Sequence, residues 1–186
     1  MTKQQTPHKF RGLEVDPRRD HMQGPANAPV TLMEYGDYQC PYCGEAYSIV
    51  KQIEQRFDDN LRFVFRNFPL AQIHAYAEVA AEAAEAAGAQ NKFWEMHDYL
   101  YEHQDQLAVP QLIAAAKRLG LDVDRFSDDL SQHAYAERVR EDFLSGVRAG
   151  VNGTPTFFIN GVRHDGAWDF DSLSEAINAQ QKRIAA

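Results

Sequence analysis

Cysteine is scarce in this chain, which has 2 cysteines among its 186 residues. A fold held together by many disulfides is therefore excluded. Long apolar runs are lacking as well, because no stretch reaches the roughly 18 apolar residues of a membrane-spanning helix. The N-terminus also contains no apolar segment of signal-peptide length. We therefore expect no membrane span and a cytoplasmic location, or a periplasmic or extracellular one if a signal peptide has been removed.

Positive charge is in deficit, with 19 Lys and Arg against 27 Asp and Glu, so that the formal net charge is −8. Nucleic-acid-binding surfaces are basic, and we therefore expect no nucleic-acid partner. A surface with this excess of one charge favours a soluble monomer. The seven histidines follow no metal-ligand spacing, and no phosphate-binding glycine loop is present. The sequence thus predicts neither a metal site nor a bound cofactor.

The two cysteines stand three positions apart, in the segment Cys40-Pro41-Tyr42-Cys43. A strand-like run precedes this segment and a helix-like run follows it. Two thiols at a helix start can close a small disulfide ring, and the helix dipole lowers the pKa of the first thiol. Pro41 suits the first helical turn, where its missing N–H costs nothing. We interpret the pair as a reversible dithiol/disulfide couple in which Cys40 attacks and Cys43 resolves.

Three other interpretations of the cysteine pair stay open. The pair could be half of a zinc site, with scattered histidines or a second subunit supplying the other ligands. In a metal-bridged dimer, zinc or iron would then be present in a fixed ratio to protein. The pair could also be a structural disulfide, although so short a ring constrains little of the unfolded chain. Inert core thiols are the third interpretation, which the polar neighbours Asp37, Gln39 and Glu45 disfavour.

The first 27 residues carry several prolines and the charged segment Asp16-Pro17-Arg18-Arg19-Asp20. This composition predicts an N-terminal arm at 1–27, which is either disordered or lies along the domain. Arg18 and Arg19 could bind an anionic partner, but a solvated turn is the simpler interpretation.

Residues 28–182 predict one α/β domain. A buried strand is expected at 29–36, a helix at 41–57 and a second strand at 61–66. A strand–helix–strand unit of this length is most simply parallel and right-handed. A helical insertion follows at about 70–149, and it starts with an alanine-rich stretch of high helix propensity.

The end of the chain predicts a β-hairpin and a helix. Residues 156–159 indicate a strand, and Asn160-Gly161 is a strong signal for a two-residue hairpin turn. A capping box formed by Ser172 and Glu175 predicts a last helix at about 172–182.

Pro155 stands directly before the first strand of this hairpin. Proline cannot donate to a strand ladder, so it marks a special backbone position. A cis Thr154–Pro155 bond would turn the chain sharply and leave backbone groups free to hold an extended substrate strand. An ordinary trans proline is equally compatible with the local sequence.

The cysteine segment after a strand, the helical insertion, and Gly153-Thr154-Pro155-Thr156 before a hairpin together resemble the DsbA-like branch of the thioredoxin superfamily. The run 28–43 looks especially like the bacterial subgroup that includes domains appended to sodium/proton antiporters. This resemblance implies an α/β thioredoxin-like fold, with a central mixed β-sheet and an all-helical insertion between a βαβ half and a ββα half. It also implies a thiol–disulfide oxidoreductase that needs no cofactor, and a cis Pro155.

The resemblance also assigns roles to residues. Cys40 would be the exposed nucleophile that forms a mixed disulfide with the substrate, and Cys43, one turn deeper, would attack that bond to release the product. Glu34 matches a buried acid of the superfamily that takes the proton of the resolving thiol. Alternatively, Glu34 points outward or pairs with an arginine, and Asp37 is a second candidate for the proton relay. The residues expected to bind substrate are Pro155, Thr154, Pro41 and Tyr42.

One residue departs from the family's strongest oxidants, which carry histidine where this chain has Tyr42. Tyrosine supplies no positive charge to the Cys40 thiolate, so we expect a less depressed pKa and a more reducing couple. The expected partners are a disulfide-containing or thiol substrate and a thiol electron partner. The alternative function is a non-catalytic peptide-binding or holdase module that uses the surface at Pro155.

Overall fold

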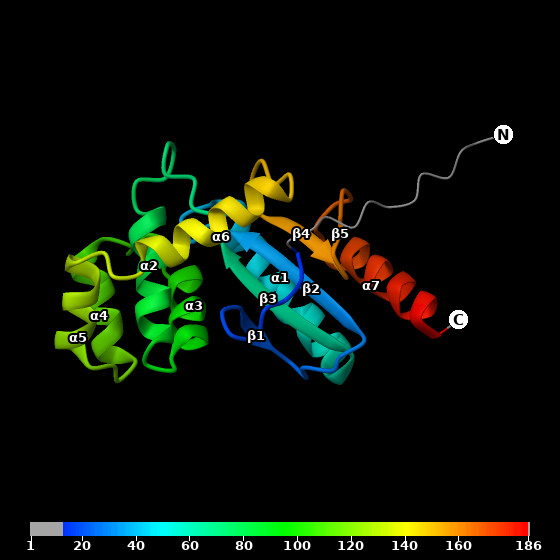
Figure 1. Ribbon diagram of the computed structural model, residues 1–186, viewed down its shortest axis with the longest axis horizontal. Coiled ribbons are helices and arrows are strands. Elements are labelled where there is room, and N and C mark those ends of the chain that lie inside the picture. The colour runs from blue at the N-terminus through cyan, green and yellow to red at the C-terminus, as the bar shows by residue number, and fades with distance from the viewer. Residues whose placement is uncertain (1–12, 186) are drawn as a thin grey trace.

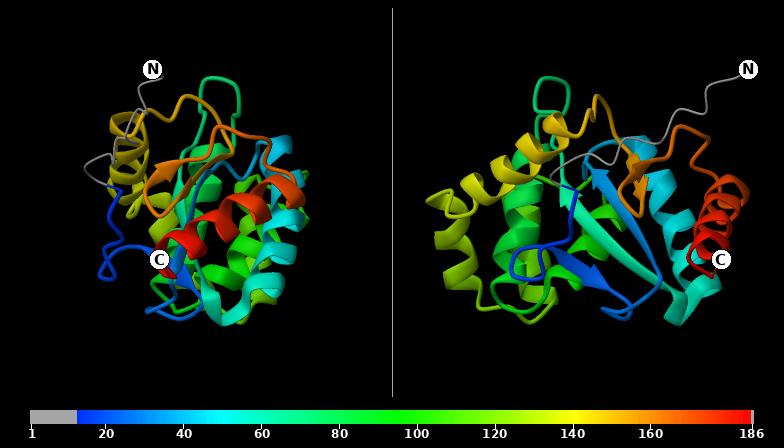
Figure 2. Two further views of the ribbon diagram at one scale, coloured as in Figure 1. Left: turned by 90° about the vertical axis from the view of Figure 1, so that its right-hand side faces the viewer. Right: turned by 45° about the vertical axis from the view of Figure 1, so that its right-hand side comes forward.

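The computed structural model describes residues 13–185, in which a five-stranded sheet lies between helices on its two faces (Figures 1 and 2). The strand order is β1-β3-β2-β4-β5. Strands β2 and β3 run parallel, whereas every other neighbouring pair is antiparallel. The strands are β1 (His21–Gln23), β2 (Val30–Gly36), β3 (Leu61–Asn67), β4 (Thr156–Ile159) and β5 (Val162–Arg163). The expected thioredoxin-like α/β fold with a mixed sheet is confirmed.

Seven α-helices and one short 3-10 helix occur in the described part of the chain. They are α1 (Pro41–Phe57), η1 (Asp58–Asn60), α2 (Ala77–Gly88), α3 (Phe93–Glu102), α4 (Val109–Arg118), α5 (Val123–Ser131), α6 (Ala136–Arg148) and α7 (Phe170–Ala185). Helices α2 to α6 form the expected insertion between β3 and β4. Figure 1 shows α4 and α5 at one end of the molecule and α7 at the other, with the sheet between them.

Helix α1 spans the residues that the sequence predicts. Its buried face follows a helical spacing of apolar residues, and it packs against one side of the sheet. The residues of this face are Cys43, Ala46, Val50, Ile53 and Phe57. The helix ends where Asp58 adopts a positive φ of 41°. Cys43 therefore lies on the buried face and Tyr42, 60% exposed, lies on the surface.

The two strands of the C-terminal hairpin are joined by the predicted turn. Asn160 and Gly161 have φ values of 49° and 78°, the left-handed conformation that a two-residue turn of this kind requires at both positions. The capping box at Ser172 is a wrong prediction, because α7 begins earlier, at Phe170. The carboxylate of Asp169 accepts the Ser172 N–H at 2.9 Å and so caps the helix start.

The N-terminal arm lies along the domain from residue 13 onward, and its residues before that lie outside the described part. Strand β1, within the arm, pairs antiparallel with β3. Leu13 is buried in a second apolar core, on the sheet face opposite α1, together with Tyr35 and Val64. The arm thus covers sheet surface that would otherwise be exposed.

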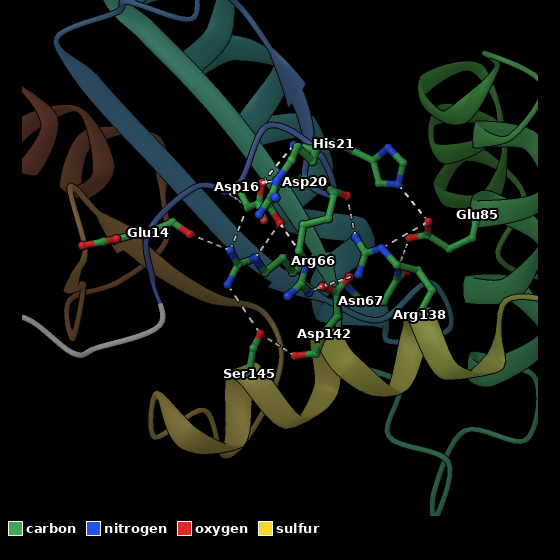
Figure 3. Close-up of polar contacts among 12 residues, drawn as sticks. Glu14, Asp16, Asp20, His21, Arg66, Asn67, Glu85, Arg138, Asp142 and Ser145 are labelled. Carbon is green, nitrogen blue, oxygen red and sulfur yellow. Dashed lines mark hydrogen bonds and ion pairs between the residues drawn. The ribbon is translucent and has the colours of Figure 1, made fainter.

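A buried ion pair fastens this arm to the sheet (Figure 3). Arg66 of β3 donates to both carboxylate oxygens of Asp20, at 2.9 and 2.8 Å. The same guanidinium donates to the Tyr35 hydroxyl and to the Glu14 carbonyl, each at 3.0 Å. The Asp20 side chain is fully buried and that of Arg66 is 2% exposed. Bidentate geometry and additional hydrogen bonds are what a buried charge pair needs to offset its desolvation.

Helix α6 joins the same network. Its Asp142 forms ion pairs with Arg19 of the arm and with Arg138 one turn earlier. Arg138 also donates to the Arg19 carbonyl at 2.8 Å. The solvated-turn interpretation therefore holds for Arg18, which is exposed and pairs with Asp16. It is wrong for Arg19, because a buried carboxylate more than a hundred residues away recruits that side chain.

We predict that Asp20→Ala lowers the free energy of unfolding by about 3–5 kcal/mol, because it leaves the buried Arg66 guanidinium without its carboxylate. Asp165→Ala is the matched control, since Asp165 pairs with Arg163 on the surface, with a side chain 81% exposed. It should cost less than about 1 kcal/mol. Urea unfolding of the reduced protein measures both, and equally small losses would contradict a stabilising role for the network.

Candidate dithiol active site

Cys40 lies at the junction of β2 and α1, where it is the N-terminal capping residue of the helix. Its backbone is extended, with φ −71° and ψ 121°, and its carbonyl accepts the Cys43 and Gly44 N–H groups at 3.1 Å. Pro41 occupies the first helical turn, as predicted. The Cys40 sulfur thus lies at the positive end of the helix dipole, where a thiolate is favoured.

The pKa of Cys40 is lowered from 9.0 to about 5. The largest cause is the hydrogen bond from the Cys43 thiol, followed by the side chain of Thr154 and by the backbone N–H groups of Cys43 and Tyr42; burial acts in the opposite direction. At neutral pH, Cys40 is therefore a thiolate in the reduced protein.

The pKa of Cys43 moves the other way. Its thiol is fully buried, and burial, followed by the hydrogen bond to Cys40, raises its pKa well above the usual value. The Asp37 N–H lies 3.5 Å from its sulfur. Both cysteines are free thiols, and Cys40 is itself 3% exposed, so the expectation of an exposed nucleophile is wrong for this structure. The pair is therefore chemically asymmetric, with one ionised sulfur next to one protonated sulfur.

Glu34 of β2 lies on the same side of the sheet as the cysteines. The strand register sets it beside Phe65 and Phe157, which belong to the apolar core under α1. Its side chain does not point outward, since the residue is 2% exposed. Burial raises its pKa from 4.5 to about 8, with further contributions from Cys40 and Glu54. Among residues 13–185, no hydrogen-bond partner contacts its Oε1.

Asp37, the second candidate for a proton relay, is committed to other contacts. Its carboxylate accepts the N–H groups of Gln39 and Leu70, both at 2.8 Å, and lies 2.7 Å from Nδ1 of His74. These bonds hold the loop that follows β3 against the segment before Cys40. Gln39 adds a third link between the two segments, after those from Asp37 to Leu70 and His74, because its side chain accepts the Tyr76 N–H at 2.6 Å. The geometry assigns Asp37 to positioning this loop.

The loop before β4 completes the site. The Thr154–Pro155 bond is cis, and the Cys40 sulfur lies 3.4 Å from the Thr154 carbonyl oxygen. A cavity of about 200 Å³ adjoins Pro155, with Arg163 and Trp168 in its walls. Pro41 and Tyr42 are exposed. The structure therefore brings Cys40, Cys43 and Thr154 into contact.

Gln104, which follows α3, contacts the active-site segment although the sequence predicts no role for it. Its side-chain amide donates to the carbonyls of Tyr38 and Cys40, at 2.9 and 2.8 Å. A Cβ atom on Gly44 would lie 2.2 Å from the Gln104 side-chain oxygen, so this approach needs a glycine. No local signal marks Gln104, because its partners lie more than sixty positions away in the chain.

No group of three or more His, Cys, Asp and Glu side chains within residues 13–185 is arranged to hold a metal ion. The helices of this region also include none with the length and apolar character needed to cross a membrane.

The sequence profile of a family described as thioredoxin matches residues 17–179. Among curated proteins, the chain is 50% identical over 167 residues to the Na(+)/H(+) antiporter NhaA 1 of Salinispora arenicola, covering 90% of this chain and 26% of that protein. It is 44% identical over 167 residues to NhaA 1 of Mycobacterium sp. (strain KMS), covering 89% and 27%. The chain thus spans about a quarter of the length of these relatives.

Solved structures share its fold. The oxidised form of BdbD from Bacillus subtilis superposes with a TM-score of 0.81 at 26% identity, covering 90% of this chain and 95% of that chain. A thioredoxin-like oxidoreductase from Silicibacter pomeroyi gives 0.79 at 27%, covering 90% and 94%. Wolbachia pipientis alpha-DsbA1 gives 0.80 at 21%, covering 93% and 96%, a likeness of fold. With the profile match over most of its length, the chain belongs to the thioredoxin family, as a DsbA-like member of the superfamily.

Proposed function

We propose that this protein is a thiol–disulfide oxidoreductase whose redox centre is Cys40 and Cys43. The observation that carries the proposal is the opposed shift of the two thiol pKa values, downward to about 5 for Cys40 and upward for Cys43. A thiolate is the nucleophile in disulfide exchange, and a protonated partner is held in reserve until the second step.

The reaction proceeds in two exchanges. The Cys40 thiolate attacks one sulfur of a substrate disulfide, which forms a mixed disulfide and releases the other substrate sulfur as a thiolate. Cys43 then loses its proton and attacks the Cys40 sulfur, which forms the Cys40–Cys43 disulfide and releases the second substrate thiolate. The substrate gains two electrons and the protein loses them. A thiol electron partner restores the dithiol, and the reverse sequence oxidises a substrate.

Glu34 accepts the Cys43 proton in this proposal. A carboxyl group with a pKa of about 8 is poised to exchange protons near neutral pH. The raised pKa of Cys43 includes a contribution from Glu34, which supports their proximity. One oxygen of this buried carboxyl group has no hydrogen-bond partner in the part of the chain that the structure describes. Such burial costs folding free energy, which is expected of a group retained for its chemistry.

Substrate binds at Thr154, Pro155, Pro41 and Tyr42 in this proposal. An extended substrate segment lies along the loop before β4, where backbone groups can pair with it. The exposed ring of Tyr42 and the cavity beside Pro155 contact the flanking side chains. The substrate is a protein or small molecule with a disulfide or thiols. A monomeric state and a cytoplasmic location stay predictions.

The stability of the Cys40 thiolate sets the oxidising strength that we propose for the couple. A pKa of about 5 lies between those of thioredoxin, about 7, and DsbA, about 3.5. A thiolate of intermediate stability makes a disulfide of intermediate oxidising strength, because the reduced form is stabilised less than in DsbA. We therefore propose a couple that is more reducing than DsbA and exchanges disulfides in either direction.

We expect Cys43→Ser to accumulate a mixed disulfide between Cys40 and a model disulfide substrate such as insulin, because attack proceeds and resolution cannot. Cys40→Ser should form no adduct and should lose turnover by at least 100-fold, since the nucleophile is gone. Non-reducing electrophoresis with mass spectrometry measures the adduct. Full function of Cys40→Ser would instead support the alternative of a non-catalytic peptide-binding or holdase module.

The alkylation rate of Cys40 should rise with pH around a midpoint near 5, as the thiolate forms. Cys43→Ala removes the largest cause of the lowered pKa and should move the midpoint upward. Tyr42→Phe is the control, because the side chain at this position is exposed, and its midpoint should not move. Iodoacetamide labelling across a pH series gives the three curves, and a wild-type midpoint above about 7 would contradict the assignment.

Glu34→Gln should slow release of the mixed disulfide and also stabilise the protein at high pH. Folding raises the pKa of Glu34 from 4.5 to about 8. Its favourable contribution to the free energy of unfolding is therefore complete below pH 4.5 and is lost as the pH rises through about 8. Glutamine does not titrate, so the variant does not lose stability in this way. The variant should therefore exceed wild type in stability above pH 8 and match it near pH 4.5, as measured by urea unfolding.

Glu45→Gln is the matched control for Glu34→Gln, because it removes the charge of an exposed residue on α1. It should change neither the release rate nor the pH profile of stability. A Glu34→Gln variant with unchanged release kinetics would remove Glu34 from the proton transfer.

A further inference from the structure

Tyr101, near the end of α3, lies beside the dithiol site and has no role in the reaction described above. It is 6% exposed. Its ring stacks on that of Tyr47, with the centroids 5.4 Å apart, and lies 4.9 Å from the ring of Tyr38. Tyr38 and Tyr47 flank the cysteine segment 40–43 in the chain, so these contacts hold the ring against that segment.

The hydroxyl group of Tyr101 lies against the end of β2. A Cβ atom on Gly36, the last residue of this strand, would lie 2.7 Å from the hydroxyl oxygen. The next residue is Asp37, whose N–H lies 3.5 Å from the Cys43 sulfur. The hydroxyl therefore reaches the backbone segment that also contacts the resolving thiol.

This Tyr101 hydroxyl is buried and has no hydrogen-bond partner among residues 13–185. The two tyrosines packed against it are paired, by contrast. The Tyr38 hydroxyl lies 3.0 Å from Nδ1 of His97. The Tyr47 hydroxyl donates to Glu102 at 3.4 Å. A buried hydroxyl without a partner costs free energy, so it calls for an explanation.

The charge on Cys43 changes during the second exchange. Until then Cys43 is a neutral thiol, because burial raises its pKa well above the usual value. Loss of its proton leaves a thiolate, which is a strong acceptor at a site closed to solvent. Burial, followed by the charge of Cys43, raises the pKa of Tyr101 well above its usual value, so the hydroxyl keeps its proton. A fixed donor that gains its partner only as charge forms stabilises the reacting state more than the resting state.

Glu34 is the other acceptor on this side of the sheet. Residues 34 and 36 point to the same face of β2, the face that the Tyr101 hydroxyl contacts. Oε1 of Glu34 also has no partner in the described part of the chain, so the resting structure contains no bond between this oxygen and Tyr101. Glu34 becomes neutral when it receives the proton, whereas Cys43 becomes charged. The sulfur is therefore the stronger acceptor during the step.

We propose that Tyr101 stabilises the resolving thiolate by donating a hydrogen bond from its hydroxyl group to the Cys43 sulfur during the second exchange. In that step the Cys43 thiol gives its proton to Glu34 and its sulfur bonds to that of Cys40. The bond between Cys40 and the substrate breaks and releases a substrate thiolate. Tyr101 keeps its own proton throughout. This role rests on the function proposed for Cys40 and Cys43, and it adds a residue from the helical insertion to that site.

The test follows the reaction of the reduced, full-length protein with the aromatic disulfide DTNB, which releases one coloured thiolate in each exchange. The first release depends on DTNB concentration and measures attack by Cys40, whereas the second does not and measures resolution by Cys43. Tyr101→Phe should slow the second release about 10- to 100-fold, the effect of losing one hydrogen bond to a charged group. The first release should stay within about twofold of wild type. An unchanged second release would overturn the proposal.

Tyr47→Phe is the matched control, because it removes a hydroxyl from the ring that stacks on Tyr101 and leaves the stack in place. It should change neither release rate. Tyr101→Phe should also unfold at a urea concentration no lower than that of wild type, since its hydroxyl has no partner to lose. A less stable Tyr101→Phe variant would give the hydroxyl a structural role and contradict the proposal.

A second background separates the two acceptors. In Glu34→Gln, the added Tyr101→Phe change should slow the second release by the same factor as in wild type, because the hydroxyl acts on the sulfur. Loss of the effect in this background would transfer the contact to Glu34 and overturn the assignment.

The same traces distinguish failure of this role from failure of the proposed function. Cys43→Ser should show the first release alone. A wild-type protein without a second release would contradict the redox function itself. Two releases in wild type, with unchanged kinetics in Tyr101→Phe, would contradict only the role of Tyr101.

Discussion

The parallel pairing of β2 with β3 places two buried charge systems on opposite faces of one sheet. Glu34 and Tyr35 are neighbours in β2, so their side chains point to opposite faces. Glu34 faces the core under α1, where the dithiol lies, and Tyr35 contacts Arg66 in the network that fastens the N-terminal arm. A shift of one residue in this register would exchange the two faces. The redox site and the attachment of the arm therefore depend on the same strand register.

The two systems treat a buried carboxylate in contrasting ways. Asp20 is fully buried and receives both arms of a guanidinium, so its charge is compensated. Glu34 is as deeply buried, and its pKa is raised to about 8 because no cation within residues 13–185 offsets its burial. A buried carboxylate that is paired with a cation stays ionised and acts as a structural group, as Asp20 does. A buried carboxyl group whose charge is not offset has a raised pKa and can exchange a proton near neutral pH, as Glu34 can.

Short-range sequence patterns predicted those helices and turns whose conformation depends on neighbouring residues. The extent of α1, the Asn160-Gly161 turn and the insertion between the two halves of the fold all follow from short-range propensity and hydrophobic spacing. The buried contact of Arg19 with Asp142 does not, since both residues are ordinary surface types until the fold joins them. Gln104 is similar, because the carbonyl groups that it contacts carry no side-chain signal in the sequence. Contacts between distant segments thus mark the limit of sequence reasoning for this fold.

The thiolate of Cys40 illustrates how such distant contacts govern reactivity. Tyr42 supplies no cation, and the sequence therefore predicts a less depressed pKa than histidine at this position would give. The pKa nevertheless falls to about 5, through the thiol of Cys43, the side chain of Thr154 and the first turn of α1. Thr154 lies more than a hundred residues from Cys40, in the loop before β4. The two residues between the cysteines are thus one of several influences on the pKa of Cys40. The loop before β4, which contains Thr154, also stabilises the thiolate.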